Sequence, residues 1–331
     1  MRTVLVIGYG SIAKRHISNI IKIDETIRII VVTKQKKIKQ HKKIEFFKKI
    51  NEAVKQNPNC AIICSRTFLH LKQAIYLSKN KIHLFIEKPI STDCSGIRNL
   101  YKICRKNKLI LMVGYNLLFD ESLIKFKRLI KKNNFGKLLS AAAEVGYYLP
   151  YWRKDRNYKN TNAAKKKYGG GVLLELSHDL NYLIWIFGYI LWISTALFKK
   201  SDLKIDVEDT AHSLIGFKNN FVATLEQDFL RKNYTRKCTV KFKKCTLMWN
   251  YKNQSIYKKV RENKKWSLIF KSKSSKNVSY LNEIKFFFKN IKNKKITNNL
   301  KLSMQTLDVI KSARLSNKFN IEKKRIKYSV V

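Results

Sequence analysis

The apolar run Val4–Ile7 leads directly into a glycine-rich turn, and this junction constrains the fold more than any other stretch of the chain. The run predicts a buried strand, and the amphipathic sequence after the turn predicts a helix. Gly8 permits a tight turn, Gly10 allows the backbone to approach a pyrophosphate, and the small Ala13 lets the helix pack against the strand. The helix N-terminus would then attract phosphates. We therefore predict a dinucleotide-binding turn at Gly8, Gly10, Ser11, Ile12 and Ala13; the alternative is an ordinary strand-to-helix turn.

Strand-like and helical segments alternate through the first third of the chain, which predicts an α/β fold with a parallel, doubly wound sheet of the Rossmann type. From about Phe119 onward the pattern favours an α+β domain with a large, mostly antiparallel, open sheet. We place the boundary between a domain over residues 1–118 and a second over residues 119–331. The expected strands of the first domain are Thr3–Ile7, Arg28–Thr33, Ala61–Cys64, His83–Ile86 and Leu109–Gly114.

Length and composition limit the class of protein. A chain of 331 residues has room for two domains, and 45% hydrophobic residues exclude a disordered chain. The N-terminus lacks the charged region, long apolar segment and cleavage site of a signal peptide. Six cysteines without a C-x-x-C pair are typical of reduced, structural thiols. Together these features predict a cytoplasmic protein.

The formal net charge of +48 is the feature that fits an ordinary enzyme least. Such an excess usually indicates nucleic acid or an anionic membrane as a partner. The lysines, however, are spread along the whole chain and alternate with Ile, Phe and Tyr in the dense stretches 34–49 and 252–301. No zinc-finger spacing, RNP-like motif or arginine-rich arm accompanies them. The pattern favours a generally cationic surface, with nonspecific polyanion binding at low salt, over a specific nucleic-acid site.

One uncharged segment, Tyr182–Phe198, has nearly the length of a membrane span. Gly188 interrupts it directly after Trp185-Ile186-Phe187. We expect a buried helix that ends there, with Gly188 as its C-terminal cap, followed by a strand through Leu197. A membrane span is the alternative interpretation.

The end of the second expected strand bears on the choice of cofactor. NAD sites typically place Asp or Glu there against the ribose hydroxyls, whereas NADP sites use basic residues. The sequence here is Thr33-Lys34-Gln35-Lys36-Lys37, without an acid. Thr33 and Lys34 therefore favour NADP over NAD.

The tripeptide Glu87-Lys88-Pro89 follows the fourth expected strand directly. A dinucleotide-binding N-terminus with this tripeptide resembles the Gfo/Idh/MocA family of NAD(P)-dependent sugar and polyol oxidoreductases. The resemblance covers nearly the whole chain and thins after about residue 251. It is also carried by Gly8–His16, Thr67-x-x-His70, Gly114–Leu117, Gly169–His178 and Val207–Ala211.

Two segments, Tyr148–Arg153 and Leu176–Tyr182, resemble a branch of that family that is often linked to bacterial surface-glycan sugars. This likeness implies an activated or amino sugar as substrate. Three positions depart from the family pattern. Leu118 stands where the family commonly has Arg, and Asn181 stands where it has Asp. The acid before His178 precedes it by three residues, whereas in many members it precedes the histidine by four. These departures leave the acid partner of His178 open.

The resemblance implies catalytic roles for three residues. Oxidation of a secondary alcohol moves a hydride to nicotinamide while a proton leaves the hydroxyl. Lys88, at the carboxyl end of a strand, can donate a hydrogen bond to the substrate oxygen and stabilise negative charge on it. His178 is the expected general acid/base, because the ordinary pKa of histidine lies near neutral pH. Glu175, three residues earlier on the same expected helix, can interact with it.

The other expected site residues follow from their positions. At the cofactor we expect Thr67, His70, Glu87, Lys88 and Asn116. At the substrate we expect Tyr115, Trp152 and Arg153, together with Lys88 and His178. A structural His178 and a loop-anchoring role for Trp152 are the alternatives. We expect no metal site, and we expect a homo-oligomer, a dimer or a tetramer.

Two other functions remain open at this point. One is a catalytically inactive, nucleotide-binding regulatory protein, and the presence of both Lys88 and His178 argues against it. The other is a basic nucleic-acid-associated protein, whose binding would persist at moderate salt only if it were more than electrostatic attraction. The sequence favours the oxidoreductase.

Overall fold

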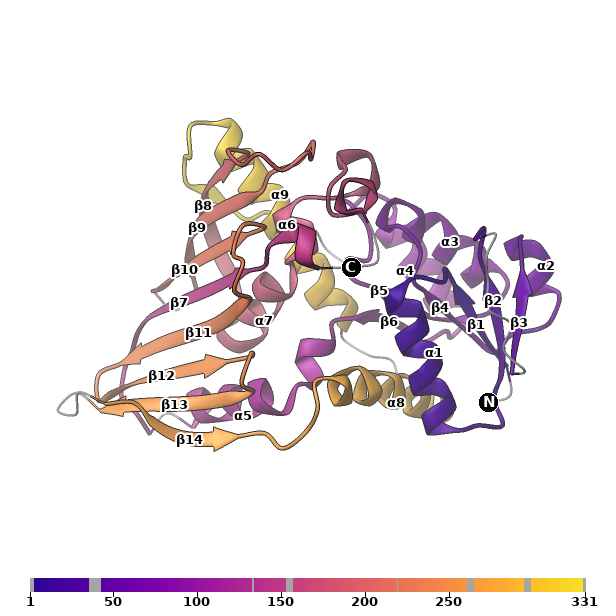
Figure 1. The fold of residues 1–331 in the computed structure, drawn as a ribbon, viewed down its shortest axis with the longest axis horizontal. Helices are drawn as coiled ribbons and strands as arrows, with labels where there is room; N and C mark the ends of the chain where they lie inside the picture. The colour runs from indigo at the N-terminus through magenta and orange to yellow at the C-terminus, as the bar shows by residue number, and fades with distance from the viewer. Residues whose placement is uncertain are drawn as a thin grey trace. The chain divides into compact units, whose positions relative to one another are not determined.

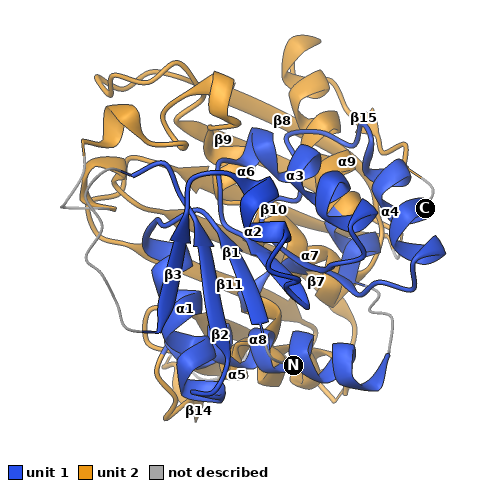
Figure 2. Cartoon of the chain, turned by 90° about the vertical axis from the view of Figure 1, so that its right-hand side faces the viewer, with its two compact units in different colours: residues 1–116, 276–303, 330–331 blue, residues 117–275, 304–329 orange. Residues whose placement is uncertain are grey.

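The computed structural model describes residues 3–35, 43–132, 134–152, 157–218, 220–260, 265–294 and 299–329. They form two compact units, which Figure 2 shows in different colours. Unit 1 comprises the described residues of 1–116 and 276–303, and unit 2 comprises those of 117–275 and 304–329.

Within the described residues, unit 1 contains a six-stranded, fully parallel sheet with the order β3–β2–β1–β4–β5–β6 (Figure 1). Its strands are β1 (Thr3–Ile7), β2 (Arg28–Val32), β3 (Ile44–Phe47), β4 (Cys60–Ile63), β5 (His83–Glu87) and β6 (Leu111–Gly114). Its helices are α1 (Ser11–Ile23), α2 (Ile50–Val54), α3 (Thr67–Lys79), α4 (Ile97–Lys106) and α8 (Asn277–Asn293).

The apolar runs of unit 1 form strands because a parallel sheet is covered on both faces. Val4, Leu5 and Val6 are all 0% exposed. The strand order reverses between β1 and β4, and such a switch point is where open α/β sheets bind ligands, outside the carboxyl ends of the strands. The expected Rossmann-type sheet is confirmed.

In its described part, unit 2 contains a nine-stranded sheet with the order β14–β13–β12–β11–β7–β10–β9–β8–β15 (Figure 1). All neighbours in it pair antiparallel except β7 and β10. The strands are β7 (Leu138–Gly146), β8 (Ile190–Phe198), β9 (Thr210–Phe217), β10 (Phe221–Asp228), β11 (Thr235–Phe242), β12 (Cys245–Asn250), β13 (Ser255–Val260), β14 (Ser267–Lys271) and β15 (Lys324–Arg325). The helices are α5 (Glu121–Lys131), α6 (Val172–Glu175), α7 (His178–Phe187) and α9 (Asn299–Lys318), of which α9 begins in unit 1. The expected large, mostly antiparallel sheet is confirmed.

The division into units differs in two respects from the expected boundary at residue 118. Unit 2 begins at Leu117, and the described residues of 276–303, which we placed in the second domain, group with unit 1. The reason is that α8 packs along α1, and the amide of Asn277 donates a hydrogen bond to the side-chain oxygen of Asn19 at 2.8 Å. A pattern read along the chain does not reveal such a return.

The sequence pattern of the second domain predicts strands at Leu138–Tyr148, Ile193–Phe198, Ala211–Phe217, Phe221–Phe229, Arg236–Phe242 and Thr246–Tyr251. Four of the described strands of the two units were therefore not expected: β3, β13, β14 and β15. Each lies at or next to an edge of its sheet. The segments of β13 and β15 include lysines, and β3 follows a lysine-rich stretch, which masks the alternation of a strand. Edge strands commonly carry lysine because it discourages pairing with other chains.

The uncharged segment 182–198 is divided between a helix and a strand. Helix α7 ends at Phe187, Gly188 caps it at φ +94°, and β8 begins at Ile190. The expected glycine cap is confirmed. Of the helices described, none has the length and apolar character needed to cross a membrane.

Candidate functional site

The turn between β1 and α1 has the geometry expected of a phosphate site. Gly8 has φ +99°, and a Cβ there would lie 2.7 Å from the carbonyl oxygen of Cys64, so only glycine fits without strain. Gly10 is the N-cap of α1 with φ −79°, and a Cβ there would meet no atom within 4 Å. The open space lies at a helix N-terminus, whose N–H groups and dipole favour an anion.

The next residues of the turn also fit a pyrophosphate. Ala13 is fully buried, which lets α1 pack closely on the sheet. Ser11 is exposed and Ile12 is half-buried. The first turn of α1 carries no acidic residue that would repel a phosphate. The residues present are thus compatible with a bound dinucleotide.

Substitutions at the two glycines separate the needs of the fold from those of the ligand. Gly8→Ala is expected to lower the free energy of unfolding by about 1–3 kcal/mol, because of its positive φ and the Cys64 carbonyl. Gly10→Asn is expected to leave stability nearly unchanged, since asparagine is a good N-cap, but to weaken dinucleotide binding at least about tenfold by filling the open space. Urea unfolding and calorimetric titration of both variants check this. Normal dinucleotide affinity in Gly10→Asn would contradict it.

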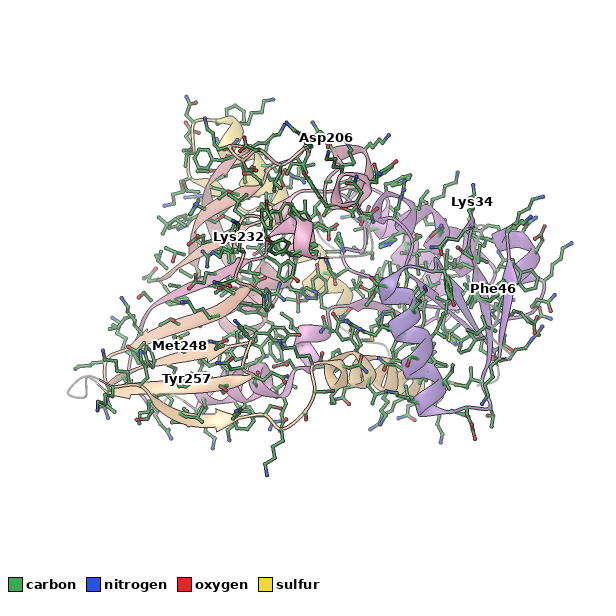
Figure 3. The ribbon with its side chains drawn as sticks, viewed as in Figure 1. Lys34, Phe46, Asp206, Lys232, Met248 and Tyr257 are labelled. Atoms are coloured by element: carbon green, nitrogen blue, oxygen red, sulfur yellow. The ribbon has the colours of Figure 1, made fainter. Side chains whose placement is uncertain are left out.

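The end of β2 carries the residues that we expect to select the cofactor. Thr33 is buried, and its hydroxyl accepts a hydrogen bond from the N–H of Gln35 at 3.2 Å. The Gln35 amide donates to the carbonyl oxygen of Tyr9 at 3.2 Å. Lys34, labelled in Figure 3, is exposed. None of these end residues is acidic; Lys36 and Lys37 lie outside the described residues.

Thr67 and His70 stand at the start of α3, after β4. Both are buried, and the two ring nitrogens of His70 lie 2.9 Å from the carbonyl oxygen of Pro89 and 3.1 Å from that of Ser65. Burial lowers the pKa of His70, while the two carbonyl oxygens act in the opposite direction. His70 thus connects the end of β4 to the residue after Lys88. The cofactor contacts of Thr67 and His70 stay predictions.

Glu87 and Lys88 stand at the carboxyl end of β5. Oε1 of Glu87 lies 2.6 Å from Nε2 of His16, and Oε2 accepts the backbone N–H of Lys88 at 3.2 Å. Lys88 is half-buried and forms a cis peptide bond with Pro89. Glu87 is therefore held inside unit 1 and orients the backbone of Lys88. Direct contacts of either side chain with a cofactor or substrate stay predictions.

Tyr115 and Asn116 follow β6 and are 1% and 2% exposed. The side-chain N–H of Asn116 donates to the hydroxyl of Ser279, on α8, at 2.9 Å. This bond ties the end of β6 to α8. The expected cofactor contact of Asn116 and substrate contact of Tyr115 stay predictions.

Glu175 and His178 do not share one helix, so that expectation is wrong. Glu175 is the last residue of α6 and His178 is the first of α7, because the backbone leaves the helical conformation at Leu176 and the two turn residues Leu176 and Ser177 separate the helices. The argument from three-residue spacing on a continuous helix therefore fails. His178 is 9% exposed and Glu175 is half-buried. Their catalytic roles stay predictions.

A buried ion pair lies next to His178 in the sequence. The carboxylate of Asp179 is 3.1 Å from Nη2 of Arg236, and the two side chains are 0% and 10% exposed. Burial by itself lowers the pKa of Arg236, but the Asp179 carboxylate and nearby tyrosines raise it by more, so the net pKa is above its usual value and the guanidinium stays charged. The pair ties the first turn of α7 to β11 and so holds the backbone that carries His178.

Trp152 is half-buried in an aromatic group of unit 2. Its ring centroid lies 5.5 Å from that of Phe229 and 5.7 Å from that of Tyr147. This packing supports the loop-anchor alternative, while its contact with substrate stays a prediction. Arg153 lies outside the described residues.

Sequence reasoning missed two buried ionisable residues, Arg236 and Glu283. No local motif marks Arg236, which lies on a strand of alternating burial. Glu283 had a weak signal, because it stands on the stripe of α8 that also carries Ile284 and Phe287. An ionisable residue on a core-facing stripe indicates a buried polar cluster.

Comparisons with known proteins bear on both units. Residues 2–115 match the family model described as "Oxidoreductase family, NAD-binding Rossmann fold", and residues 123–248 match the "GFO/IDH/MocA C-terminal domain". Together these matches cover most of the chain.

Individual relatives are more distant. A myo-inositol 2-dehydrogenase of Thermotoga maritima is 28% identical over 138 residues, 40% of this chain and 41% of that protein. The uncharacterized oxidoreductase YrbE of Bacillus subtilis is 25% identical over 232 residues, 67% of this chain and 65% of that protein. The matches thus span less than two thirds of either relative. A levoglucosan dehydrogenase solved with NADH has the same fold, with a TM-score of 0.83, 14% identity, and coverage of 99% of this chain and 100% of that chain.

Proposed function

The chain belongs to the Gfo/Idh/MocA family of oxidoreductases, and on that premise we propose that it transfers a hydride between NAD(P) and a hydroxyl or carbonyl group of a sugar or sugar derivative. One observation carries the proposal: the Gly8–Gly10 turn and Lys88 follow β1 and β5, at the carboxyl edge of the same parallel sheet. Ligands of open α/β sheets bind at this edge. A glycine turn alone would support nucleotide binding, but the added lysine supports chemistry on a substrate oxygen.

The cofactor, when bound, accepts or supplies the hydride at its nicotinamide ring. The role we propose for Lys88 is to donate a hydrogen bond to the substrate oxygen and to stabilise negative charge on it. The hydrogen bond from the Lys88 backbone to Glu87 fixes the main chain at that point. Fixed donors stabilise a transition state without the cost of reorganisation.

His178 is the proposed general base for alcohol oxidation. As the alcohol C–H bond breaks, the hydroxyl proton passes to the imidazole and the carbon–oxygen double bond forms; reduction reverses these steps. The Asp179–Arg236 pair supports this role because it fixes the start of α7. Glu175 remains a candidate to orient the imidazole, from the end of α6.

Our finer proposal is that NADP is preferred to NAD, because the described end of β2 offers exposed Lys34 and no carboxylate for ribose hydroxyls. Lys34→Glu is then expected to weaken NADPH binding about tenfold and to leave NADH binding unchanged or improved. Calorimetric titration of both cofactors checks this. The exposed Lys72→Glu on α3 is the control for a general loss of positive charge. Equal losses in the two variants would contradict the assignment.

Nucleotide binding itself is tested by titrating the protein with NADPH and NADH at salt high enough to suppress polyanion binding. We expect saturable binding at one site per chain, and its loss in Gly10→Asn. Absence of binding for both cofactors would overturn the proposed function. Binding that disappears as salt rises would indicate only attraction to the +48 charge.

The remaining parts of the proposal concern the substrate and the assembly. We propose an activated or amino sugar as substrate, a homo-oligomer and a cytoplasmic location. The first rests on the resemblance of Tyr148–Arg153 and Leu176–Tyr182 to the surface-glycan branch of the family. Light scattering at high salt would test the oligomer.

A further inference from the structure

A cluster of three buried acid–base groups lies behind the Glu87-Lys88 segment, inside unit 1. His16 comes from α1, Glu87 ends β5 and Glu283 comes from α8, and one nitrogen or oxygen atom of each lies within 4.8 Å of the others. His16 and Glu283 are both 0% exposed, and Glu87 is 8% exposed. Water therefore screens their charges only weakly. The protonation state of each group depends mainly on the other two.

The three groups differ in their hydrogen bonds. His16 contacts Glu87, and Glu87 accepts the backbone N–H of Lys88. Both carboxyl oxygens of Glu283 and Nδ1 of His16, in contrast, are buried and have no hydrogen-bond partner among the described residues. A buried carboxylate without a partner is far more costly than a neutral carboxyl group, so Glu283 gains most from keeping its proton.

The surroundings of Glu283 favour the neutral form. The titratable groups that face it are Glu87 from β5, His16 from α1 and the Cys64 thiol after β4. Burial raises the pKa of Glu283 well above its usual value, and the negative charge of Glu87 raises it further. Two ionised carboxylates at this distance would repel each other strongly in a buried site.

We propose that Glu283 is a positioning residue that stays protonated at neutral pH, leaves Glu87 as the single negative charge of the cluster, and thereby keeps Glu87 on the backbone N–H of Lys88. Loss of the Glu283 proton would place a second carboxylate beside Glu87. The repulsion between the two would push the Glu87 side chain away from His16 and from the backbone N–H of Lys88. The effect on turnover rests on the proposed function, since it acts through Lys88. The proton assignment itself does not.

A divalent cation is the other chemistry that such a cluster could hold. Ligand atoms around a tetrahedral zinc ion, at bond lengths near 2.1 Å, stand about 3.4 Å apart. Nε2 of His16 and Oε1 of Glu87 are 2.6 Å apart, which is much closer than two ligand atoms of one ion and is the separation of a short hydrogen bond. The geometry therefore favours a hydrogen bond between His16 and Glu87 over a metal ion.

Glu283→Gln tests the proton directly, because the amide is neutral at every pH and nearly the same size. We expect the infrared difference between wild type and Glu283→Gln, at about pH 7.5, to contain the carbonyl band of a protonated carboxylic acid that shifts in D2O. Absence of that band would overturn the proposal. So would a divalent cation that wild type retains in stoichiometric amount, by elemental analysis, and the variant loses.

Unfolding provides a second readout. In the unfolded chain Glu283 ionises near pH 4.3, whereas in the folded chain it keeps its proton to higher pH, so stability is lost as pH rises between the two values. The unfolding constant of wild type should then rise, relative to Glu283→Gln, about tenfold per pH unit in that range. Urea titrations at several pH values measure the ratio. A ratio that does not change with pH would overturn the proposal. The exposed Glu52→Gln is the control, and the ratio of the wild-type unfolding constant to that of this variant should not depend on pH in that way.

Turnover tests the positioning role. The ratio of kcat for Glu283→Gln to that for wild type should rise with pH once Glu283 begins to ionise. A ratio that stays constant, with the infrared band present, would overturn the positioning role. If no sugar is turned over, the proposed function fails, whereas the infrared and unfolding measurements still decide the proton assignment.

Discussion

Replacing Lys88 with methionine is expected to lower kcat about 100- to 10,000-fold, while the dissociation constant of the dinucleotide changes by less than about threefold. Methionine has nearly the length of lysine but cannot donate a hydrogen bond or carry charge. The proposed loss is therefore confined to stabilisation of the substrate oxygen. Steady-state kinetics with the preferred cofactor, combined with calorimetric titration, measures the two quantities separately.

The exposed Lys102→Met on α4 is the matched control, because it removes one positive charge from the same unit. It should retain wild-type kcat. Lys88→Arg adds a further test, since arginine keeps the charge but presents it in a planar fork and so should restore little activity. Wild-type turnover in Lys88→Met would exclude Lys88 from the chemistry.

Arg236→Met is expected to lower the free energy of unfolding by about 3–5 kcal/mol. The substitution leaves the carboxylate of Asp179 buried and without its guanidinium, 0% exposed at the first turn of α7. Displacement of that turn should also reduce kcat, because His178 begins the helix. Urea unfolding followed by tryptophan fluorescence measures the stability.

An exposed ion pair provides the comparison. Arg28 and Glu45 approach to 2.7 Å, but their side chains are 43% and 49% exposed. Arg28→Met should therefore cost less than about 1 kcal/mol. Similar destabilisation in Arg28→Met and Arg236→Met would show that burial does not determine the strength of these pairs, contrary to our expectation.

The parts of the fold that the sequence predicted well are those with local causes. The strand Thr3–Ile7 has the expected bounds and the expected helix follows the glycine turn as Ser11–Ile23, because an apolar run, a glycine turn and a helical stripe all lie within a short stretch. Gly188 ends α7 as expected, since a residue with positive φ favours glycine. Lys88 follows a strand as expected, because the apolar run before it marks that strand.

The parts that were missed depend on contacts between distant residues. Glu283 reaches Glu87 only because α8 returns to pack on α1, and Arg236 reaches Asp179 only because β11 lies near α7 in the fold. The break between Glu175 and His178 was also missed, because apolar residues surround it and no glycine or proline marks it. Tertiary packing decides such breaks, and local propensity is then a weak guide.

The measurement that tests the central claim most directly is the reduction of NADP+ and NAD+, followed by absorbance, with a panel of inositols, free sugars, amino sugars and nucleotide sugars. We predict saturable reduction with at least one of them, at salt that suppresses polyanion binding, and its loss in Lys88→Met. If both cofactors bind but no compound of the panel is oxidised, and no corresponding carbonyl compound is reduced, the result would contradict a dehydrogenase and support a nucleotide-binding regulatory protein.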